Sequence, residues 1–481
     1  MFKKLIYTGL GRAGVPVACM ALAITSCKTP ALVTRTENRT VPTSYSTGQD
    51  TLNTGKAKWR EFFTDPYLTA LIDTALHNNQ ELNITLQEIQ VAQNEIRART
   101  GEYLPFVGLQ AGAGVDKVGR YTRSGAIEEN TEIRPGREFP TPLPDFLLSA
   151  NVSWQVDIWN KLHNAKRAAA TRYLSSIEGR NFTVTNLVAE IANSYYELLG
   201  LDSQLDIVKR NIDIQTNALA IVRIEKESAK VTELAVRRFE AQVLRTQSLQ
   251  YDIQQRIVET ENRINFLVGR FPQPVQRSSQ DFNTLVPEVM HGGIPSQLLQ
   301  NRPDIRRAER DLEAAKLDVQ VARANFLPSL DLSAAVGFNS YNPALLLNPE
   351  SLLYSLIGGF TRPFVNRNAI KSLYYSANAR QIQAVYNYER TILNAYIEVA
   401  NQLSNINNLQ KSYDLKAKQV DALIQSTNIS NTLFKSARAD YMEVLLTQRD
   451  ALESRFDLVE TKVQQLNAMV NTYRALGGGW K

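Results

Sequence analysis

The feature of this 481-residue chain that most constrains its fold is an internal repeat. Residues 92–114 align with residues 315–337, and a later segment that begins at 228 aligns with one that begins at 436. Matched positions include Leu104-Pro105 with Leu327-Pro328, Gly114 with Gly337, Ser228-Ala229-Lys230 with Ser436-Ala437-Arg438, and Gly269 with Gly477. A repeated sequence predicts a repeated structural unit. We therefore predict two repeats, 66–291 and 292–481, with the same organisation.

Each repeat is predicted to contain a helix, a strand, a loop, a second strand, a very long helix, a turn and a further long helix. The offset between matched segments falls from 223 to 208 residues along the chain, so the first repeat carries a longer insertion. The segment Asp116–Asp145, rich in Pro, Gly and charged residues, is the candidate insertion, because its counterpart Asn339–Ser351 is shorter.

Four segments are predicted to be strands from the period-2 alternation of apolar residues. Residues 146–158 and 329–338 alternate clearly, and residues 105–115 and 352–364 less cleanly. The apolar positions are Phe146, Leu148, Ala150, Val152, Trp154, Val156 and Ile158 in one clear segment, and Leu330, Leu332, Ala334, Val336 and Phe338 in the other. Each segment has roughly the 9–11 residues that a tilted strand needs to cross a bilayer.

Four strands cannot close a barrel on their own. An open sheet edge in lipid would leave backbone groups without hydrogen-bond partners. The sheet is therefore either soluble and packed on helices, or formed by several chains that pool their strands into one barrel.

The long helices favour pooling. No proline occurs from Leu162 to Lys226, which predicts a helix of about 100 Å at ~1.5 Å per residue. Apolar residues recur at seven-residue steps, which is typical of coiled-coil packing. These heptad positions are Ile191, Leu198, Leu205, Ile212, Leu219, Val236, Val243, Ile257 and Ile264 in the first repeat, and Ile392, Val399, Ile406, Tyr413, Val420, Phe434, Leu445, Leu452, Val459, Leu466 and Tyr473 in the second.

Residues 1–26 are predicted to be a signal peptide, because a basic segment precedes the apolar stretch Ala13–Ile24. Ile24-Thr25-Ser26-Cys27 resembles the lipobox of bacterial lipoproteins. That resemblance implies that Cys27 becomes an acylated N-terminus, and several acyl chains make a firm anchor. Residues 27–65 would then form an N-terminal anchor and periplasmic segment. A plain signal peptide with incidental cysteines is the alternative.

Composition argues against several classes of function. Basic residues exceed acidic ones by six, and loss of Lys3, Lys4 and Arg12 with the signal peptide halves that excess. So small a positive charge does not indicate a nucleic-acid-binding protein. Two cysteines cannot build a disulfide framework or a thiolate metal site, and three scattered histidines leave little for a metal or general-base centre. We expect no catalytic site, no metal and no cofactor. Beyond the N-terminus there is no apolar run long enough for a transmembrane helix.

The second repeat contains the segment Asn301-Arg302-Pro303-Asp304-Ile305-Arg306-Arg307-Ala308-Glu309, and Phe326-Leu327-Pro328 follows it. This segment resembles the RPDI-xx-AE signature of the TolC family of outer-membrane efflux proteins, in particular of its OprM-like lipoprotein branch. The terminal Ala475–Trp480 (ALGGGW) is similar to the end of that branch. From the residues alone, Pro303 and Asp304 indicate a helix start.

The resemblance covers nearly the whole chain from Trp59 onward and implies a homotrimer. Four strands from each of three chains would make a 12-stranded β-barrel in outer-membrane lipid, and the long helices would continue it as a trimeric α-barrel across the periplasm. The helical hairpins would then meet a periplasmic adaptor protein and an inner-membrane pump of the resistance-nodulation-division type.

The resemblance also assigns the two helical turns, Ser228–Glu233 and Ser436–Tyr441, as the periplasmic tips. Residues that would contact the adaptor are Ala229, Lys230, Ala437 and Arg438. Family members usually carry Gly where Ala229 and Ala437 stand, and Ala disfavours positive φ. The geometry of both turns is therefore expected to differ from the family's.

By the same alignment, Met442, Leu446 and Arg449 lie on one face just past the second tip and would form the channel gate. Family members commonly have an apolar residue, an acidic residue and an Arg there, so Leu446 replaces the acid. Arg449 would then pair with a neighbouring carboxylate; the candidates are Asp440, Glu443 and Asp450. An ordinary coiled-coil seam with an exposed Arg449 is the alternative.

We therefore expect the outer-membrane exit duct of a tripartite efflux pump, which passively conducts drugs or other small toxic compounds. A duct for type I protein secretion is a same-fold alternative. A lipid-anchored periplasmic coiled-coil scaffold is an alternative of another class, and a hydrolase is a distant one.

Overall fold

The computed structural model describes residues 29–45, 52–278, 282, 285, 287, 289–362, 367–436 and 438–480. The chain forms two compact units, and each combines segments of both repeats. The first, here called the strand unit, contains residues 91–173 and 310–385 together with residues 29–36. The second, the hairpin unit, contains residues 37–90, 174–309 and 386–481. Cys27 and Ala437 lie outside the described residues.

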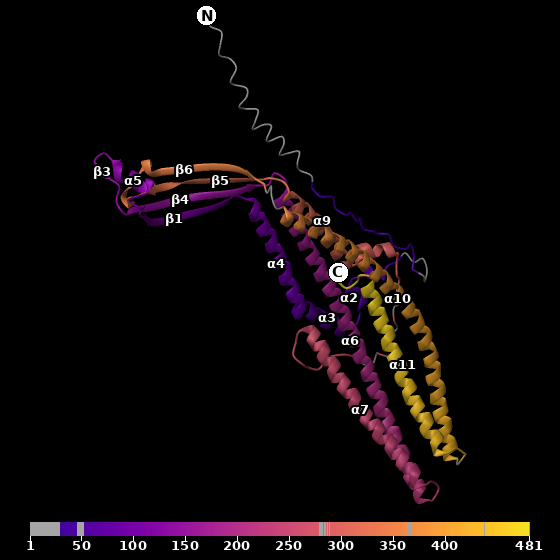
Figure 1. Cartoon of the computed structure of the whole chain (residues 1–481). Coiled ribbons are helices and arrows are strands. Elements are labelled where there is room, and N and C mark those ends of the chain that lie inside the picture. Colours follow the sequence, from indigo (N-terminus) through magenta and orange to yellow (C-terminus); the bar gives the residue numbers. More distant parts are fainter. Residues whose placement is uncertain are drawn as a thin grey trace. The chain divides into compact units, whose positions relative to one another are not determined.

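The main elements are labelled in Figure 1. Their bounds are η1 (Thr54–Lys56), α2 (Trp59–Phe62), α3 (Pro66–Asn78), α4 (Gln80–Tyr103), β1 (Phe106–Asp116), α5 (Arg123–Asn130), β2 (Glu132–Arg134), β3 (Arg137–Glu138), β4 (Leu143–Val156), α6 (Lys161–Glu227), α7 (Glu233–Val268), η3 (Pro295–Gln297), α8 (Leu298–Asn301), α9 (Pro303–Ala324), β5 (Ser329–Ser340), η4 (Pro343–Leu345), η5 (Pro349–Ser351), β6 (Leu352–Thr361), α10 (Asn368–Lys435) and α11 (Tyr441–Ala475).

The strand unit is built on a four-stranded antiparallel sheet in the order β1-β4-β5-β6. All four predicted strands are present, with their ends moved by a few residues: β4 begins at Leu143 and ends before Ile158, and β6 ends at Thr361. The predicted insertion contains α5 and a two-stranded sheet of β2 and β3, which period-2 analysis did not find because the strands are too short. In Figure 1 the four long strands run side by side, with α5 and β3 at one end of the sheet.

The two faces of this sheet differ in chemistry. On one face Val152 lies opposite Ala334 and Trp154 lies opposite Leu332, so the apolar sets of β4 and β5 are in register. The edge strands add Leu109 and Leu356, which are 86% and 80% exposed in the isolated chain. Large exposed apolar patches mark surfaces that contact lipid or another chain.

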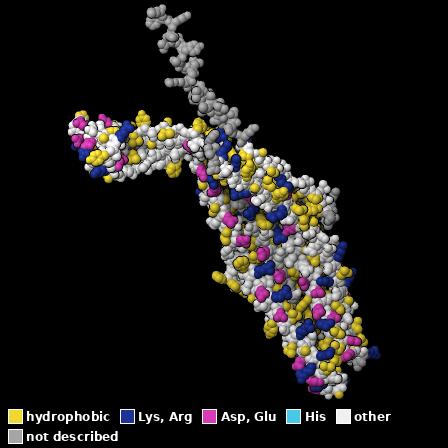
Figure 2. All heavy atoms as spheres, in the orientation of Figure 1, with side chains coloured by type: hydrophobic (Ala, Val, Ile, Leu, Met, Phe, Trp, Pro, Cys, Tyr) yellow, Lys and Arg dark blue, Asp and Glu magenta, His cyan; other side chains and the backbone are white. Residues whose placement is uncertain are grey.

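The opposite face is polar and hydrogen-bonded across the strands. The Asn151 amide donates to the Gln110 side chain at 3.2 Å, and the Gln155 amide donates to the Asp331 carboxylate at 3.3 Å. Figure 2 shows charged side chains gathered at the end of the sheet that carries α5 and β3, with few along its middle on the visible face. The sheet therefore has the alternation of a strand between lipid and water.

The hairpin unit contains most of α6 and α10, all of α7 and α11, and the largest hydrophobic cluster found among the described residues. The predicted helix Leu162–Lys226 is confirmed as α6, and every heptad position named above is buried or partly buried. The core packs aromatic residues of the N-terminal segment against the last helix, and the rings of Phe62 and Tyr473 stack at 4.1 Å. Among the described residues, no helix combines the length and the apolar character needed to cross a membrane.

The repeat is visible in the ends of α7 and α11. Gly269 and Gly477 have φ of 75° and 87°, in the left-handed region that favours glycine. At both ends the same hydrogen bond closes the helix, from Arg270 N to Asn265 O at 2.9 Å and from Gly478 N to Tyr473 O at 3.0 Å. The glycines that the sequence alignment matched therefore terminate equivalent helices.

Candidate functional site

The first tip is a tight turn between α6 and α7, as predicted. Ala229 has φ of 54°, an unusual conformation for a residue with a Cβ atom. The turn is closed by a hydrogen bond from Lys230 N to Glu225 O at 2.9 Å. At the second tip, between α10 and α11, Arg438 N donates to Leu433 O at 2.9 Å in the same pattern. At the first tip the expectation of a changed turn geometry is therefore wrong: Ala229 adopts the positive φ that favours glycine, at a cost in strain.

Charged residues surround the first tip. Glu233, the first residue of α7, accepts from Lys226 Nζ at 2.5 Å and from Arg237 Nε at 2.8 Å. The hydrogen bond from Lys226 lowers the pKa of Glu233, and the guanidinium of Arg237 acts in the same direction. Lys230 and Arg438 are exposed on the two turns.

The two hairpins pack against each other near their tips through a small hydrophobic cluster within the hairpin unit. Its buried members are Leu219, Val222, Ala235, Val236, Phe239, Val243 and Val444. Val444 belongs to α11, whereas the others belong to α6 and α7, so the cluster holds the second hairpin beside the first. Tyr441 and Leu445 of α11 pack on its edge.

The three predicted gate residues lie on the first turns of α11. The side chain of Arg238 on α7 contacts the Met442 sulfur with its Nη1 at 2.5 Å. Leu446 is 41% exposed. Arg449 pairs with Asp450, with Nη2 3.0 Å from Oδ1, and its side chain remains 43% exposed. Of the three carboxylates proposed for Arg449, the structure therefore selects Asp450.

The Asn301–Glu309 signature begins α9, as Pro303 and Asp304 predicted, and it also builds a buried charge network. Arg302 donates to Asp304 at 2.7 Å, to Glu398 of α10 at 2.8 Å and to the Ala475 carbonyl at 2.7 Å. Burial opposes its charge, but the two carboxylates raise the pKa of Arg302 above its ordinary value. Because Glu398 also accepts from Arg474 at 2.8 Å, the start of α9 is tied to the end of α11.

The C-terminal ALGGGW segment closes on the same signature. The Trp480 indole donates to the Gly477 carbonyl at 2.9 Å and to the Asn301 carbonyl at 3.3 Å. The Arg306 guanidinium lies 5.6 Å from the centre of the Trp480 ring, within cation–π range. A Cβ at Gly477 would lie 2.8 Å from the Asn301 oxygen, so glycine is required there. The sequence did not predict that the Asn301–Glu309 signature and the ALGGGW segment form one site.

The sequence also did not predict the role of a second cation, the partly buried Arg277. Arg277, in the segment after α7, donates to Asp202 at 2.6 Å and to Glu261 at 2.5 Å. Against the effect of burial, the two carboxylates raise the pKa of Arg277. No periodic pattern marks this residue, because it lies outside any helix or strand. Among the described residues, no three His, Cys, Asp or Glu side chains are grouped as metal ligands would be.

Comparison with known proteins agrees with this geometry. The chain is 28% identical over 96% of its length to the cation efflux system protein CusC of Escherichia coli O6:H1, and covers 98% of that protein. It is 27% identical to the pyoverdine export outer membrane protein OpmQ of Pseudomonas aeruginosa, with 88% of each chain covered. It shares the fold of the open-state MtrE outer membrane channel of Neisseria gonorrhoeae, with a TM-score of 0.81, 22% identity, and 94% of this chain and 99% of that one covered.

The sequence profile of the outer membrane efflux protein family matches residues 71–270 and 294–478, which are the two repeats almost in full. The family match thus covers the β-strands, both long hairpins and the network around Arg302. The chain belongs to the outer membrane efflux protein family.

Proposed function

We propose that this protein is the outer-membrane exit duct of a tripartite efflux pump of the resistance-nodulation-division type, which conducts small toxic compounds passively and performs no catalytic step. The observation that carries the proposal is the sheet with one exposed apolar face and one polar face, in a chain of the outer membrane efflux family. An apolar outer face suits lipid, and a polar inner face suits a water-filled lumen.

The duct would be a homotrimer. The sheet has two edge strands, β1 with 11 residues and β6 with 10, which are similar in length. Pairing of β6 of one chain with β1 of the next would close a 12-stranded barrel and remove every open edge. The long hairpins would form the periplasmic α-barrel below it.

The tips would contact the periplasmic adaptor through Ala229, Lys230, Ala437 and Arg438. Exposed cations on both turns support this assignment, since Lys230 and Arg438 are available to a partner's carboxylates. Adaptor binding would favour the open state by differential affinity for the two conformations.

Met442, Leu446 and Arg449 would form the gate. The pairing of Arg449 with Asp450 supports this role, because it would allow three symmetry-related guanidinium groups to approach one axis without full repulsion. Closure would then depend on apolar contact at Met442 and Leu446. Opening would require the second hairpin to leave the Val444 cluster.

Cys27 would be the acylated N-terminus that adds a lipid anchor to the barrel. The Ile24-Thr25-Ser26-Cys27 sequence supports this, and Cys27→Ala should abolish metabolic labelling by a fatty acid. Persistent labelling of that variant would refute the assignment.

Transport is tested by deleting the gene and measuring the intracellular accumulation of a panel of fluorescent dyes and toxic cations. Deletion should raise accumulation of some compounds, and the wild-type gene should restore the original level. Val152→Arg, which should prevent stable insertion, is the inactive control. Unchanged accumulation together with loss of a secreted protein from the medium would instead indicate the type I secretion alternative.

A further inference from the structure

The pairing registers of the four-stranded sheet repeat along with the sequence. Phe106 of β1 lies opposite Ser153 of β4, and Ser329 of β5 lies opposite Thr361 of β6. The residues of β1 and β5 in these two pairs are 223 positions apart, and those of β4 and β6 are 208 positions apart. These are the two offsets that align the repeats. The pairing of β1 with β4 and the pairing of β5 with β6 are therefore the same structural pair.

The central pairing, of β4 with β5, has no counterpart among the described strands of one chain. Under the same offsets β4 corresponds to β6, and β5 corresponds to β1. The counterpart would therefore join β6 to β1, which are the two edges of the sheet. A second copy of the chain can supply it, because an unpaired edge strand is a template for pairing with another chain.

The repeat also gives the register of the missing pairing. Val152 of β4 lies opposite Ala334 of β5. The offset of 208 carries Val152 to Phe360 of β6. The offset of 223 carries Ala334 back to Ala111 of β1. Phe360 of one chain would then lie opposite Ala111 of the next.

Side-chain direction agrees with this register. Phe360 lies opposite Leu330, which belongs to the apolar set of β5. Ala111 lies opposite Leu148, which belongs to the apolar set of β4. Phe360 and Ala111 are thus both on the apolar face, so each face of the sheet continues across the edge. A shift of one residue would set an apolar face against a polar one.

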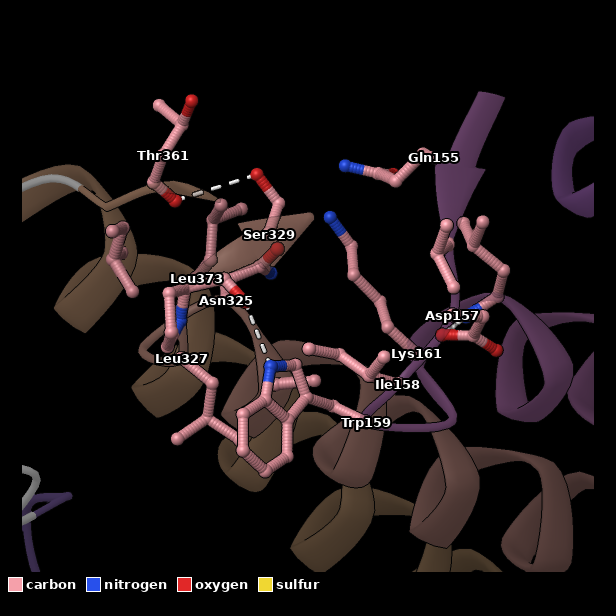
Figure 3. A pocket seen from close by; sticks show the side chains of 15 residues that line it. Gln155, Asp157, Ile158, Trp159, Lys161, Asn325, Leu327, Ser329, Thr361 and Leu373 are labelled. Atoms are coloured by element: carbon pink, nitrogen blue, oxygen red, sulfur yellow. Dashed lines mark hydrogen bonds between the residues drawn. The ribbon is translucent and has the colours of Figure 1, made fainter. Parts of the chain in front are cut away.

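Helix contacts accompany the central strand pairing. α6 follows β4 and α9 precedes β5, and Arg172 of α6 forms an ion pair with Asp318 of α9. Figure 3 shows the cavity of about 350 Å³ at this junction, where the Trp159 indole donates to the Pro328 carbonyl at 2.7 Å. The junction of β4 with β5 therefore combines a strand register with a charge pair between helices.

The counterparts of that charge pair keep both charges. The offset of 208 carries Arg172 to Arg380 of α10, which follows β6. The offset of 223 carries Asp318 back to Glu95 of α4, which precedes β1. Arg380 is exposed and forms no salt bridge with a residue that the structure describes. A cation and a carboxylate therefore lie beside opposite edges of the sheet, where the repeat predicts a pair.

A neighbouring arginine does not prevent this pairing. Glu95 lies 2.9 Å from Nε of Arg99 on the same helix, and half of its side chain is exposed. Arg99 also contacts Glu102 at 3.0 Å, so it keeps a carboxylate when Glu95 turns to another cation. Exposed pairs of this kind within one helix are weak.

The surface of α4 is also uncovered in its own chain. α4 is 24 residues long and buries a single one. Val91 of α4 is 69% exposed, whereas its counterpart on α9, Ala314, is 1% exposed. The same position of the repeat is thus buried in one copy and open in the other.

We propose that a second copy of this chain binds at the sheet edge as β5 and α9 bind to β4 and α6 within one chain. In this repeat interface, β6 pairs with β1 of the next chain so that Phe360 lies opposite Ala111. Arg380 forms an ion pair with Glu95 of the next chain, and Val91 is covered. The inference rests on the proposed trimer, to which it adds a strand register and an ion pair.

The register is tested in intact cells with the full-length protein and four engineered cysteines. Ala111→Cys with Phe360→Cys and Ala113→Cys with Gly358→Cys are the two pairs in register. Exchanging the partners gives two control pairs that contain the same cysteines and are two residues out of register. Directly opposite Cβ atoms lie about 4.5–5.5 Å apart and diagonal ones about 7–8 Å, whereas a disulfide needs about 3.5–4.5 Å.

On oxidation the two pairs in register should give covalent trimers several times faster than the exchanged pairs. Faster cross-linking of an exchanged pair, or equal rates for all four pairs, would overturn the repeat interface and leave the duct standing, because the chains would still meet at these edges. Failure of every cysteine pair across the two edges would instead refute the proposed duct itself.

The ion pair is tested by charge reversal. Glu95→Arg and Arg380→Glu should each lower the temperature at which half of the purified trimer dissociates in detergent, because like charges then meet at the repeat interface. The two substitutions combined should restore most of that shift. If the combined variant is no more stable than Glu95→Arg alone, these residues do not pair and the repeat interface is wrong.

Discussion

Ser153 of β4 and Ser333 of β5 lie directly opposite each other, on the same face of the sheet as Gln155 and Asp331. One residue away, Val152 lies opposite Ala334 on the other face. Neighbouring positions of one strand therefore face different environments. In the proposed duct, Ser153 and Ser333 face water, whereas Val152 and Ala334 face lipid.

Arginine substitutions on adjacent residues of β4 should separate these environments. Val152→Arg should destabilise the folded protein by roughly 2–4 kcal/mol if the residue faces lipid near the midplane. Ser153→Arg should be accommodated in a wet lumen. The readout is the fraction of heat-modifiable oligomer in outer-membrane extracts. Equal damage from both substitutions would indicate a soluble sheet buried on both faces.

The strain at the first tip predicts a stabilising substitution. Ala229 has φ of 54°, and a left-handed conformation costs an L-residue roughly 1–2 kcal/mol. Glycine avoids this strain, but its more flexible unfolded chain offsets part of the gain in stability. Ala229→Gly should therefore raise the free energy of unfolding by up to about 1 kcal/mol. Hydrogen exchange at the tip amides measures the change.

Ala241→Gly is the matched control for that substitution. Ala241 is exposed within α7, where glycine should destabilise by about 1 kcal/mol. Opposite signs for the two variants are expected. Destabilisation by both would mean that the Ala229 turn is not strained in solution.

The network around Arg302 should be among the costliest to break. Its side chain is 8% exposed and pairs with two carboxylates, so Arg302→Met leaves both partly buried and unpaired. Loss of one partner of a buried pair typically costs about 3–5 kcal/mol. The exposed pair of Arg310 and Glu313 should contribute less than about 1 kcal/mol, so Arg310→Met is the control. Similar denaturant midpoints for the two variants would contradict this account.

The gate is tested by single-channel recording of the purified protein in planar bilayers. Met442→Ser combined with Arg449→Ala should raise the resting conductance, because it removes apolar contact and the charged side chain together. Leu446→Asp, which restores the acid common in the family, should increase the preference for small cations. If recordings show neither change, the constriction lies elsewhere in the duct.

Periodic patterns predicted the regular elements of this fold. The strands followed from alternation and α6 followed from the absence of proline, because both signals are local. The alignment of Gly269 with Gly477 correctly matched two helix ends. The small elements of the insertion were missed, since β2 and β3 have only 3 and 2 residues.

Long-range contacts could not be read from such patterns. Arg302 and Ala475 are 173 residues apart, and only folding brings the start of α9 to the end of α11. The cavity at the ends of β4 and β6 likewise combines Trp159, Leu327 and Leu373 from three separate segments. The pairing of Arg449 with Asp450, one of three candidate carboxylates, depends on side-chain conformation, which the sequence does not show.

The central claim, that chains pool their strands into one closed barrel, is tested most directly by disulfide cross-linking between β1 and β6 in intact cells. Cys19 and Cys27 are the chain's two cysteines, and both lie before the described residues, so engineered pairs can be read without interference. Pairs with one cysteine in 107–113 and one in 353–359 should give covalent trimers in the outer-membrane fraction on oxidation. Single-cysteine chains should not form them. If no pair across these edges yields trimers, the sheet is not closed by neighbouring chains and the account of the duct is wrong.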